Sequence, residues 1–183
     1  MAANVELIQT SRIVANGGEI TSDRYINDGS ADLAAGELCF LLNGTIVPVS
    51  TSAAQIDTDT TAFATAGKYF ISLEDVDVSE DSGGYVKVQE VTADSVLEGY
   101  VVDSGVTGDV TMAVADIGEK YCGYVTAAGM FGVDNASQTK PVFVIEDVDD
   151  NYEPYRAEGD FEKDSSGVRH QRVRFKLLNA LIA

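Results

Sequence analysis

Tryptophan is absent from this 183-residue chain, and cysteine, proline and histidine are scarce, with two, three and one copies. Two isolated cysteines, Cys39 and Cys122, make neither a disulfide framework nor a zinc motif, so we expect buried free thiols. The single histidine, His170, has no partners for nucleophilic catalysis, and we expect it to be an exposed strand residue. The sequence therefore predicts no catalytic site.

Basic residues are also few, because 12 Lys/Arg stand against 30 Asp/Glu and give a net charge of −18. Nucleic acid and anionic membranes would repel such a protein, so we expect it to bind neither directly. No apolar run approaches the roughly 20 residues of a membrane helix. The N-terminus lacks the basic and apolar regions of a signal peptide, so we expect a protein made in a cytoplasm.

Helical periodicity is missing as well, whereas short apolar runs alternate with Gly, Asn and Asp turns. Asn43-Gly44 between the runs 37–42 and 45–49 is a strong β-hairpin signature. The pattern predicts an all-β fold, a small barrel or sandwich with long loops. Further strands are expected at 68–73, 85–91, 96–102, 109–115, 120–126 and 141–148.

The predicted organisation is an extended N-terminal arm, or short strands, over residues 1–35 and a single β domain over 36–183. Within that domain, 50–67 reads as a long polar connection. Residues 146–164 carry nine acidic and two basic residues and read as an exposed acidic loop. We see no exact internal repeat.

Two acidic segments have alternating oxygen ligands of the kind that a hard cation prefers. The first matches positions 1, 3, 5 and 12 of an EF-hand-like loop with Asp147, Asp149, Asn151 and Glu158, but Tyr152 stands where the turn needs glycine. The second, Asp75, Asp77, Ser79 and Asp81, also lacks the glycine. We read both as solvated loops and predict no metal and no cofactor.

The one basic stretch, Val168 to Leu178, holds four of the 12 Lys/Arg and no acidic residue, which leaves 8 basic and 30 acidic groups elsewhere, a balance of −22. From Arg172 the cations alternate with apolar residues, as in a strand with one buried face. Such a strand can neutralise the protein's own acidic surface or dock onto an acidic partner, including an identical subunit. The candidate partner-binding residues are Arg172, Arg174 and Lys176, with Val5 to Val14 as a second attachment.

The run Ala34 to Val49, with its Gly-Glu-Leu start and Asn-Gly-Thr turn, resembles the opening hairpin of tailed-phage capsid decoration (cement) and related virion structural proteins. Short Gly-punctuated strands continue this style to about residue 130, at 68–74, 99–102 and 123–129. The resemblance implies a β-barrel or β-tulip-like fold on the capsid exterior. It also implies binding between major capsid subunits, often as a trimer, and it brings no catalytic residues.

We therefore expect a non-enzymatic virion structural protein, a capsid decoration or stabilising protein that binds the major capsid protein and forms a homo-oligomer. The alternatives are a phage fibre or baseplate module, a carbohydrate-binding β module and, third, a hydrolase. Aromatic side chains exposed on one sheet face would favour carbohydrate binding.

Overall fold

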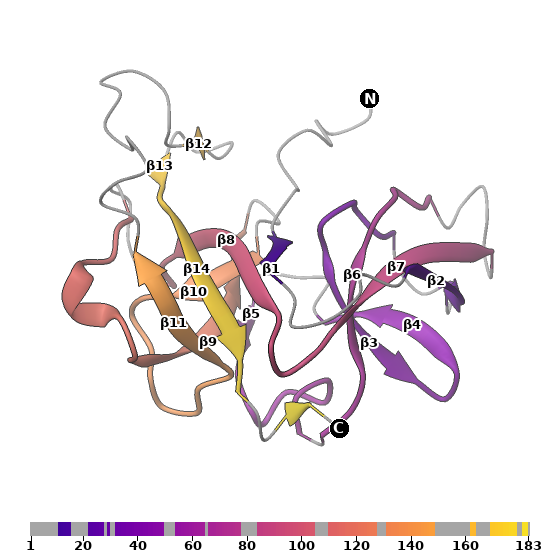
Figure 1. Ribbon diagram of the computed structural model, residues 1–183, viewed down its shortest axis with the longest axis horizontal. Helices are drawn as coiled ribbons and strands as arrows, with labels where there is room; N and C mark the ends of the chain where they lie inside the picture. Colours follow the sequence, from indigo (N-terminus) through magenta and orange to yellow (C-terminus); the bar gives the residue numbers. More distant parts are fainter. Residues whose placement is uncertain are drawn as a thin grey trace.

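The computed structural model describes residues 11–15, 22–27, 29, 32–49, 54–64, 66–77, 84–104, 110–127, 131–148, 162–163, 169–178 and 181–182. Strands and turns make up these residues, together with one short 3-10 turn, η2 (Val114–Asp116). Most strands form two groups, one from the N-terminal half of the chain and one mainly from the C-terminal half (Figure 1). The predicted all-β barrel fold is confirmed.

The first group closes into a barrel, with the strand order β2-β4-β3-β6-β7. Its strands are β2 (Ser22–Asn27), β3 (Leu38–Leu42), β4 (Thr45–Pro48), β6 (Tyr69–Ser72) and β7 (Tyr85–Val91). β2 and β4 are parallel, and the other neighbours are antiparallel. The predicted hairpin is β3–β4, whose turn residues Asn43 and Gly44 have φ of 51° and 88°. Positive φ at both positions explains the Asn-Gly pair.

The second group also closes, because β14 pairs with β11 on one side and with β8 on the other. Its ring is β8-β10-β9-β11-β14, formed by β8 (Val96–Val102), β9 (Lys120–Val125), β10 (Phe131–Asp134), β11 (Phe143–Val148) and β14 (Arg172–Leu177). β1 (Ser11–Ala15) extends it along β8, and β5 (Ala54–Ile56) along β9. A separate two-stranded sheet joins β12 (Glu162–Lys163) and β13 (Arg169–His170).

The two barrels have the same strand topology. In each, the first strand in sequence runs parallel to the third and antiparallel to the fifth, and the second pairs with the third and the fourth. The register is the same too: Thr45, Ile26 and Tyr85 lie in a cross-strand row, as do Gly132, Tyr100 and Arg172. The structure therefore contains an internal duplication.

A shared turn supports the duplication. Gly36 and Gly118 both have φ of 86°, and both begin a Gly-Glu pair just before the second strand. The Gly36 N–H donates to the Ser72 carbonyl at 2.8 Å, and the Gly118 N–H donates to the Ile145 carbonyl at 2.9 Å. Glu-Asp-Val-Asp also occurs twice, at 74–77 and 146–149, but it follows β6 in the first barrel and begins within β11 in the second, so the two copies are not at corresponding positions. A β-bulge between Ile145 and Asp147, together with connections of different length, explains why the sequence shows no exact repeat.

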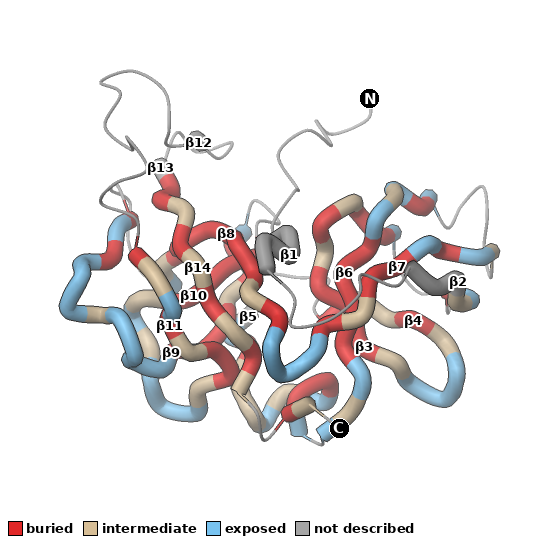
Figure 2. Tube along the Cα trace, viewed as in Figure 1, coloured by how far each residue is buried: buried red, intermediate tan, exposed pale blue. Residues whose placement is uncertain are grey.

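Each barrel has its own interior cluster, and the larger cluster extends onto the outer face of the first barrel. Cys39, Ile46, Phe70, Val86 and Val88 belong to the cluster inside the first barrel. A larger cluster fills the second barrel and also includes the outward side chains of β3 and β6. Its bridge is Phe63, whose ring stacks on Tyr69 at 5.3 Å and meets the edge of Phe143 at 6.2 Å. Buried positions accordingly recur along the strands of both barrels (Figure 2).

Several expectations need correction. Over its described part, residues 110–115, the predicted strand 109–115 is absent, since Val110 makes only an isolated bridge and η2 follows. The polar connection 50–67 contains β5 and the buried Phe63. β10 was not foreseen, because its four residues include Gly132 and end in an aspartate. In the 1–35 segment, β1 and β2 are hydrogen-bonded into the sheets, while Val5 lies outside the described residues.

Candidate functional site: the basic strand

The basic strand β14 alternates as predicted. Val173, Phe175 and Leu177 are buried inside the second barrel. Arg172, Arg174 and Lys176 stand on the outside with side chains 34%, 32% and 28% exposed. Because the strand completes the barrel, its apolar half is needed for folding, and only the outer half could take part in recognition.

Arg172 lies between a carboxylate and an aromatic ring. Its Nη1 is 3.5 Å from Glu98 Oε1 on β8. Its Nη2 donates a hydrogen bond to the Tyr100 hydroxyl at 2.7 Å, and its guanidinium carbon lies 4.7 Å from the centre of the Tyr100 ring. A planar guanidinium suits this combination of ion pair and stacking.

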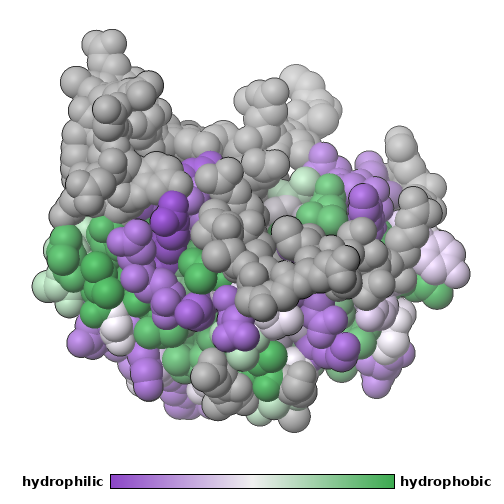
Figure 3. Space-filling view, in the orientation of Figure 1, coloured by the Kyte–Doolittle hydropathy of each residue, from purple (hydrophilic) through white to green (hydrophobic). Residues whose placement is uncertain are grey.

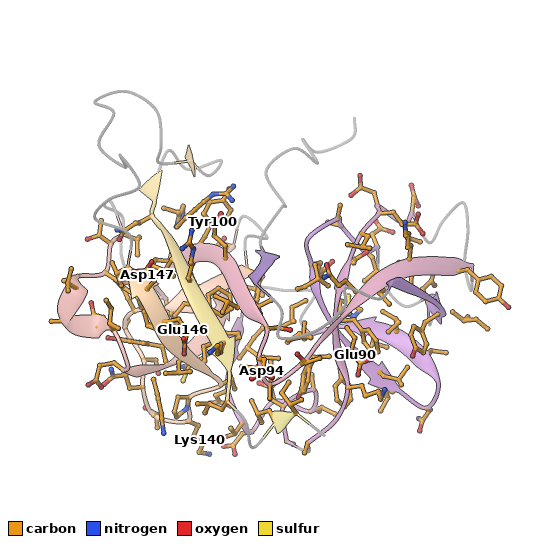
Figure 4. All side chains as sticks on the ribbon, in the orientation of Figure 1. Glu90, Asp94, Tyr100, Lys140, Glu146 and Asp147 are labelled. Carbon is orange, nitrogen blue, oxygen red and sulfur yellow. The ribbon has the colours of Figure 1, made fainter. Side chains whose placement is uncertain are left out.

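Arg174 and Lys176 also face acidic residues of the same chain. Arg174 lies 3.7 Å from Glu98 Oε2 and 3.6 Å from Asp147 Oδ2, and Lys176 lies 3.1 Å from Glu146 Oε2. Tyr100, Asp147 and Glu146 flank β14 in Figure 4, and hydrophilic side chains follow this strand across the surface (Figure 3). Glu98 is the innermost member, with 4% of its side chain exposed.

Three cations therefore meet three carboxylates, and the outer side of β14 forms a nearly neutral network. This geometry supports the first role considered for the strand, neutralisation of the chain's own acidic surface. Partner binding by Arg172, Arg174 and Lys176 stays a prediction. The backbone of Arg169 precedes the network in β13.

His170 is buried, with 2% exposed, so the expectation of an exposed histidine is wrong. Its Nδ1 lies 2.8 Å from the Val101 carbonyl and donates to it, since a carbonyl can only accept. The neighbouring Gln171 accepts a hydrogen bond from the Met112 N–H at 2.8 Å. Both side chains anchor the end of β14 to the second barrel.

The cysteines are free and buried, as expected. Burial, followed by the nearby Glu37, raises the pKa of the Cys39 thiol well above its ordinary value. Burial also raises the pKa of Glu37 to about 7, although Glu37 Oε2 accepts a hydrogen bond from the Ala34 N–H. Sequence patterning cannot single out Glu37, because its burial depends on the fold.

Asp134 is a second buried carboxylate that sequence reasoning missed. It has no exposed surface, and its Oδ1 accepts hydrogen bonds from the N–H groups of Ala136 and Ser104 at 3.1 and 3.4 Å. Burial raises its pKa. These bonds tie the end of β10 to the end of β8, where the two parallel strands lie side by side.

The calcium candidates are not gathered into a site among the described residues. Asp147 pairs with Arg174, and Asp75 Oδ1 accepts a hydrogen bond from the Ala35 N–H. No group of three or more His, Cys, Asp or Glu able to hold a metal ion occurs in the described ranges. Ser79, Asp81, Asp149, Asn151 and Glu158 lie outside them.

A different surface is the exposed apolar end of the first barrel. Tyr85 is 64% exposed, Leu42 41%, and Ile26 and Leu73 40% each. Ile26 stands opposite Tyr85 on β7 and Thr45 on β4, and Thr45 stands opposite Leu42 on β3. Three of the four thus belong to one cross-strand row that the sequence did not single out.

The comparisons with known proteins add no relative. No protein family, no curated protein and no solved structure matches this chain. In the part of the chain that the structure describes, no helix is long and apolar enough to cross a membrane.

Proposed function

We propose that this chain is a non-enzymatic structural protein of a phage virion, which decorates the capsid and stabilises it by binding across major capsid subunits. The observation that carries the proposal is the exposed apolar row of the first barrel. Large apolar side chains that gather at one end of a barrel are typical of a protein-binding face.

The assignment to a virion is supported by the resemblance of Ala34 to Val49 to the hairpin of decoration proteins. That hairpin is β3–β4 and carries Leu42 and Thr45 of the exposed row. The tip of this hairpin is therefore part of the exposed surface that a partner could bind. Decoration by many copies makes individually weak contacts collectively strong, since separating two capsid subunits must also break the contacts that bridge them.

The test is reconstitution on purified capsids that lack this protein. We expect the protein to sediment with the capsids up to a fixed number of copies and to raise their melting temperature. Recovery of all the protein in the supernatant, at concentrations where capsids are in excess, would exclude the proposal. Light scattering of the free protein tests the accompanying proposal of a homo-oligomer such as a trimer.

A carbohydrate-binding module is the second candidate, because Tyr85 presents a largely exposed ring on a sheet face. Sugar rings stack on such faces, but the neighbours Ile26 and Leu73 are aliphatic and offer no further ring. Binding of purified host surface polysaccharide, lost in Tyr85→Ala and kept in Ile26→Ser, would favour this candidate over decoration.

A further inference from the structure

The exposed apolar side chains gather in two places. Among the described residues, six large apolar side chains are exposed, and four of them belong to the first barrel. Three of those four, Ile26, Leu42 and Tyr85, form what we call the row end. The other two, Val114 and Ile117, are 54% and 42% exposed and form the η2 end. In Figure 1, η2 is the short coil at the left end of the long axis, whereas β2 ends and β7 begins at the right end.

The second barrel buries the row that the first barrel exposes. By register, the corresponding row in the second barrel is Arg172, Tyr100, Gly132 and Tyr124. Tyr100 is buried, and the guanidinium carbon of Arg172 lies 4.7 Å from the centre of its ring. Tyr124 packs partly buried against Tyr100 and Val102. This row of the second barrel is therefore covered within the chain itself.

The segment before the shared glycine turn differs in the opposite sense. In the first barrel, Leu33 and Ala34 precede Gly36 and are buried. The Leu33 N–H donates to the Val76 carbonyl at 3.0 Å, and the Val76 N–H donates to the Leu33 carbonyl at 2.8 Å. In the second barrel, η2 precedes Gly118, and its apolar side chains are exposed. Each barrel thus exposes an apolar surface that its counterpart buries, so the two ends are chemically different.

Carboxylates border both ends. Near the row end, Glu74 Oε1 accepts a hydrogen bond from the backbone N–H of Lys87, two residues after Tyr85 on β7. At the η2 end, Asp116 lies within η2, and the exposed Glu119 follows two residues after the last apolar side chain. The net charge of −18 adds a negative field to both. An apolar surface in such surroundings is complementary to an apolar surface bordered by Lys or Arg.

We infer that the η2 end is a second binding surface, and that the two ends hold two different sites of the partner, each an apolar surface bordered by Lys or Arg. Because the ends differ, one kind of site would be bound unequally by the two of them. One molecule therefore links two partner subunits, with the row end on one and the η2 end on the other. This inference rests on the proposed function, in which the partner is the major capsid protein, and adds the surfaces that make the link.

Serine substitutions separate the two ends. Leu42→Ser with Tyr85→Ser removes apolar surface from the row end, and Val114→Ser with Ile117→Ser removes it from the η2 end. All four side chains are exposed, so the melting temperature of the free protein should stay close to that of the wild type. Ala93→Ser, in the exposed turn between β7 and β8, is the control that should change nothing.

Each double variant should bind undecorated capsids about a hundredfold more weakly than the wild type, because a bivalent contact becomes monovalent. At saturating concentration, each should still bind but should no longer raise the melting temperature of the capsids, since it no longer links two subunits. This loss of stabilisation with retained binding is the result that a single-surface contact would not give.

The acidic border of the η2 end has a matched pair of variants. Glu119→Lys and Lys120→Glu change the charge in opposite directions at neighbouring exposed positions. Glu119→Lys should weaken capsid binding about tenfold, because it places a cation against the basic border of the partner, and Lys120→Glu should not weaken it. The reverse order would overturn the basic border.

The outcomes distinguish this inference from the proposed function. Capsid binding and stabilisation that survive Val114→Ser with Ile117→Ser would overturn the inference and leave decoration through the row end standing. A wild type that neither binds nor stabilises capsids would reject both proposals. Association of the free protein that disappears in either double variant would show that the two ends bind each other in a head-to-tail assembly of this chain, which would also overturn the inference.

Discussion

At the scale of single residues, Glu98 is the carboxylate of the network whose charge most needs neighbouring cations. It is nearly buried and faces two arginines, whereas Lys176 and Glu146 form a more exposed pair. Replacing Arg172 and Arg174 with Gln removes both cations beside a buried carboxylate, and we expect a loss of roughly 2 to 4 kcal/mol in the free energy of unfolding. Lys176→Gln should cost about 1 kcal/mol or less.

Denaturant melts measure both losses. Adding Glu98→Gln to the double variant should recover part of the stability, because the buried charge is then gone. A double variant as stable as Lys176→Gln would show that water solvates Glu98. Association measured on the same variants at low and high salt tests whether the strand also binds a partner, since screened charge contacts weaken with salt.

Glu37 gives the protein a pH dependence near neutrality. Its pKa rises from 4.5 to about 7 in the folded state. Between these values the folded protein retains a proton that the unfolded chain has lost, so stability falls as pH rises through this window. Glu37→Gln should therefore be more stable than the wild type at pH 8, by about 1 to 3 kcal/mol, and nearly equal to it at pH 4.5. Thermal melts at both pH values decide this, and a constant difference would contradict it.

At the scale of elements, two glycines are required for different reasons, Gly44 for a turn and Gly132 for the close approach of two strands. Gly44 needs its φ of 88° for the β3–β4 turn, with open space around it, while a Cβ on Gly132 would lie 2.3 Å from the Tyr100 carbonyl oxygen. Gly44→Ala should cost about 1 kcal/mol through backbone strain alone. Gly132→Ala should cost several times more, because the parallel β8–β10 pair must separate. Melting of both variants tests this, and equal losses would contradict the close approach.

At the scale of the whole molecule, Phe63 joins the two barrels through Tyr69 and Phe143. Because the larger cluster is shared between the two barrels, we expect both barrels to unfold in one transition. Phe63→Ala should cost about 3 to 5 kcal/mol and separate the transition into two. Calorimetry distinguishes one unfolding transition from two. Val114→Ala on η2, a half-exposed position, is the control that should leave a single transition.

The sequence by itself determined the strand-rich class, the β3–β4 hairpin, most strands of both barrels, the free buried cysteines and the alternation of β14. These follow from local rules, since period-two patterning and turn chemistry act over a few residues. Only the tertiary structure decided which carboxylates surround Arg172 and Arg174, that His170 is buried, and that the chain contains one barrel twice. Those features depend on the strand register between segments as distant as Glu98 and Arg174. Composition and residue spacing do not specify that register.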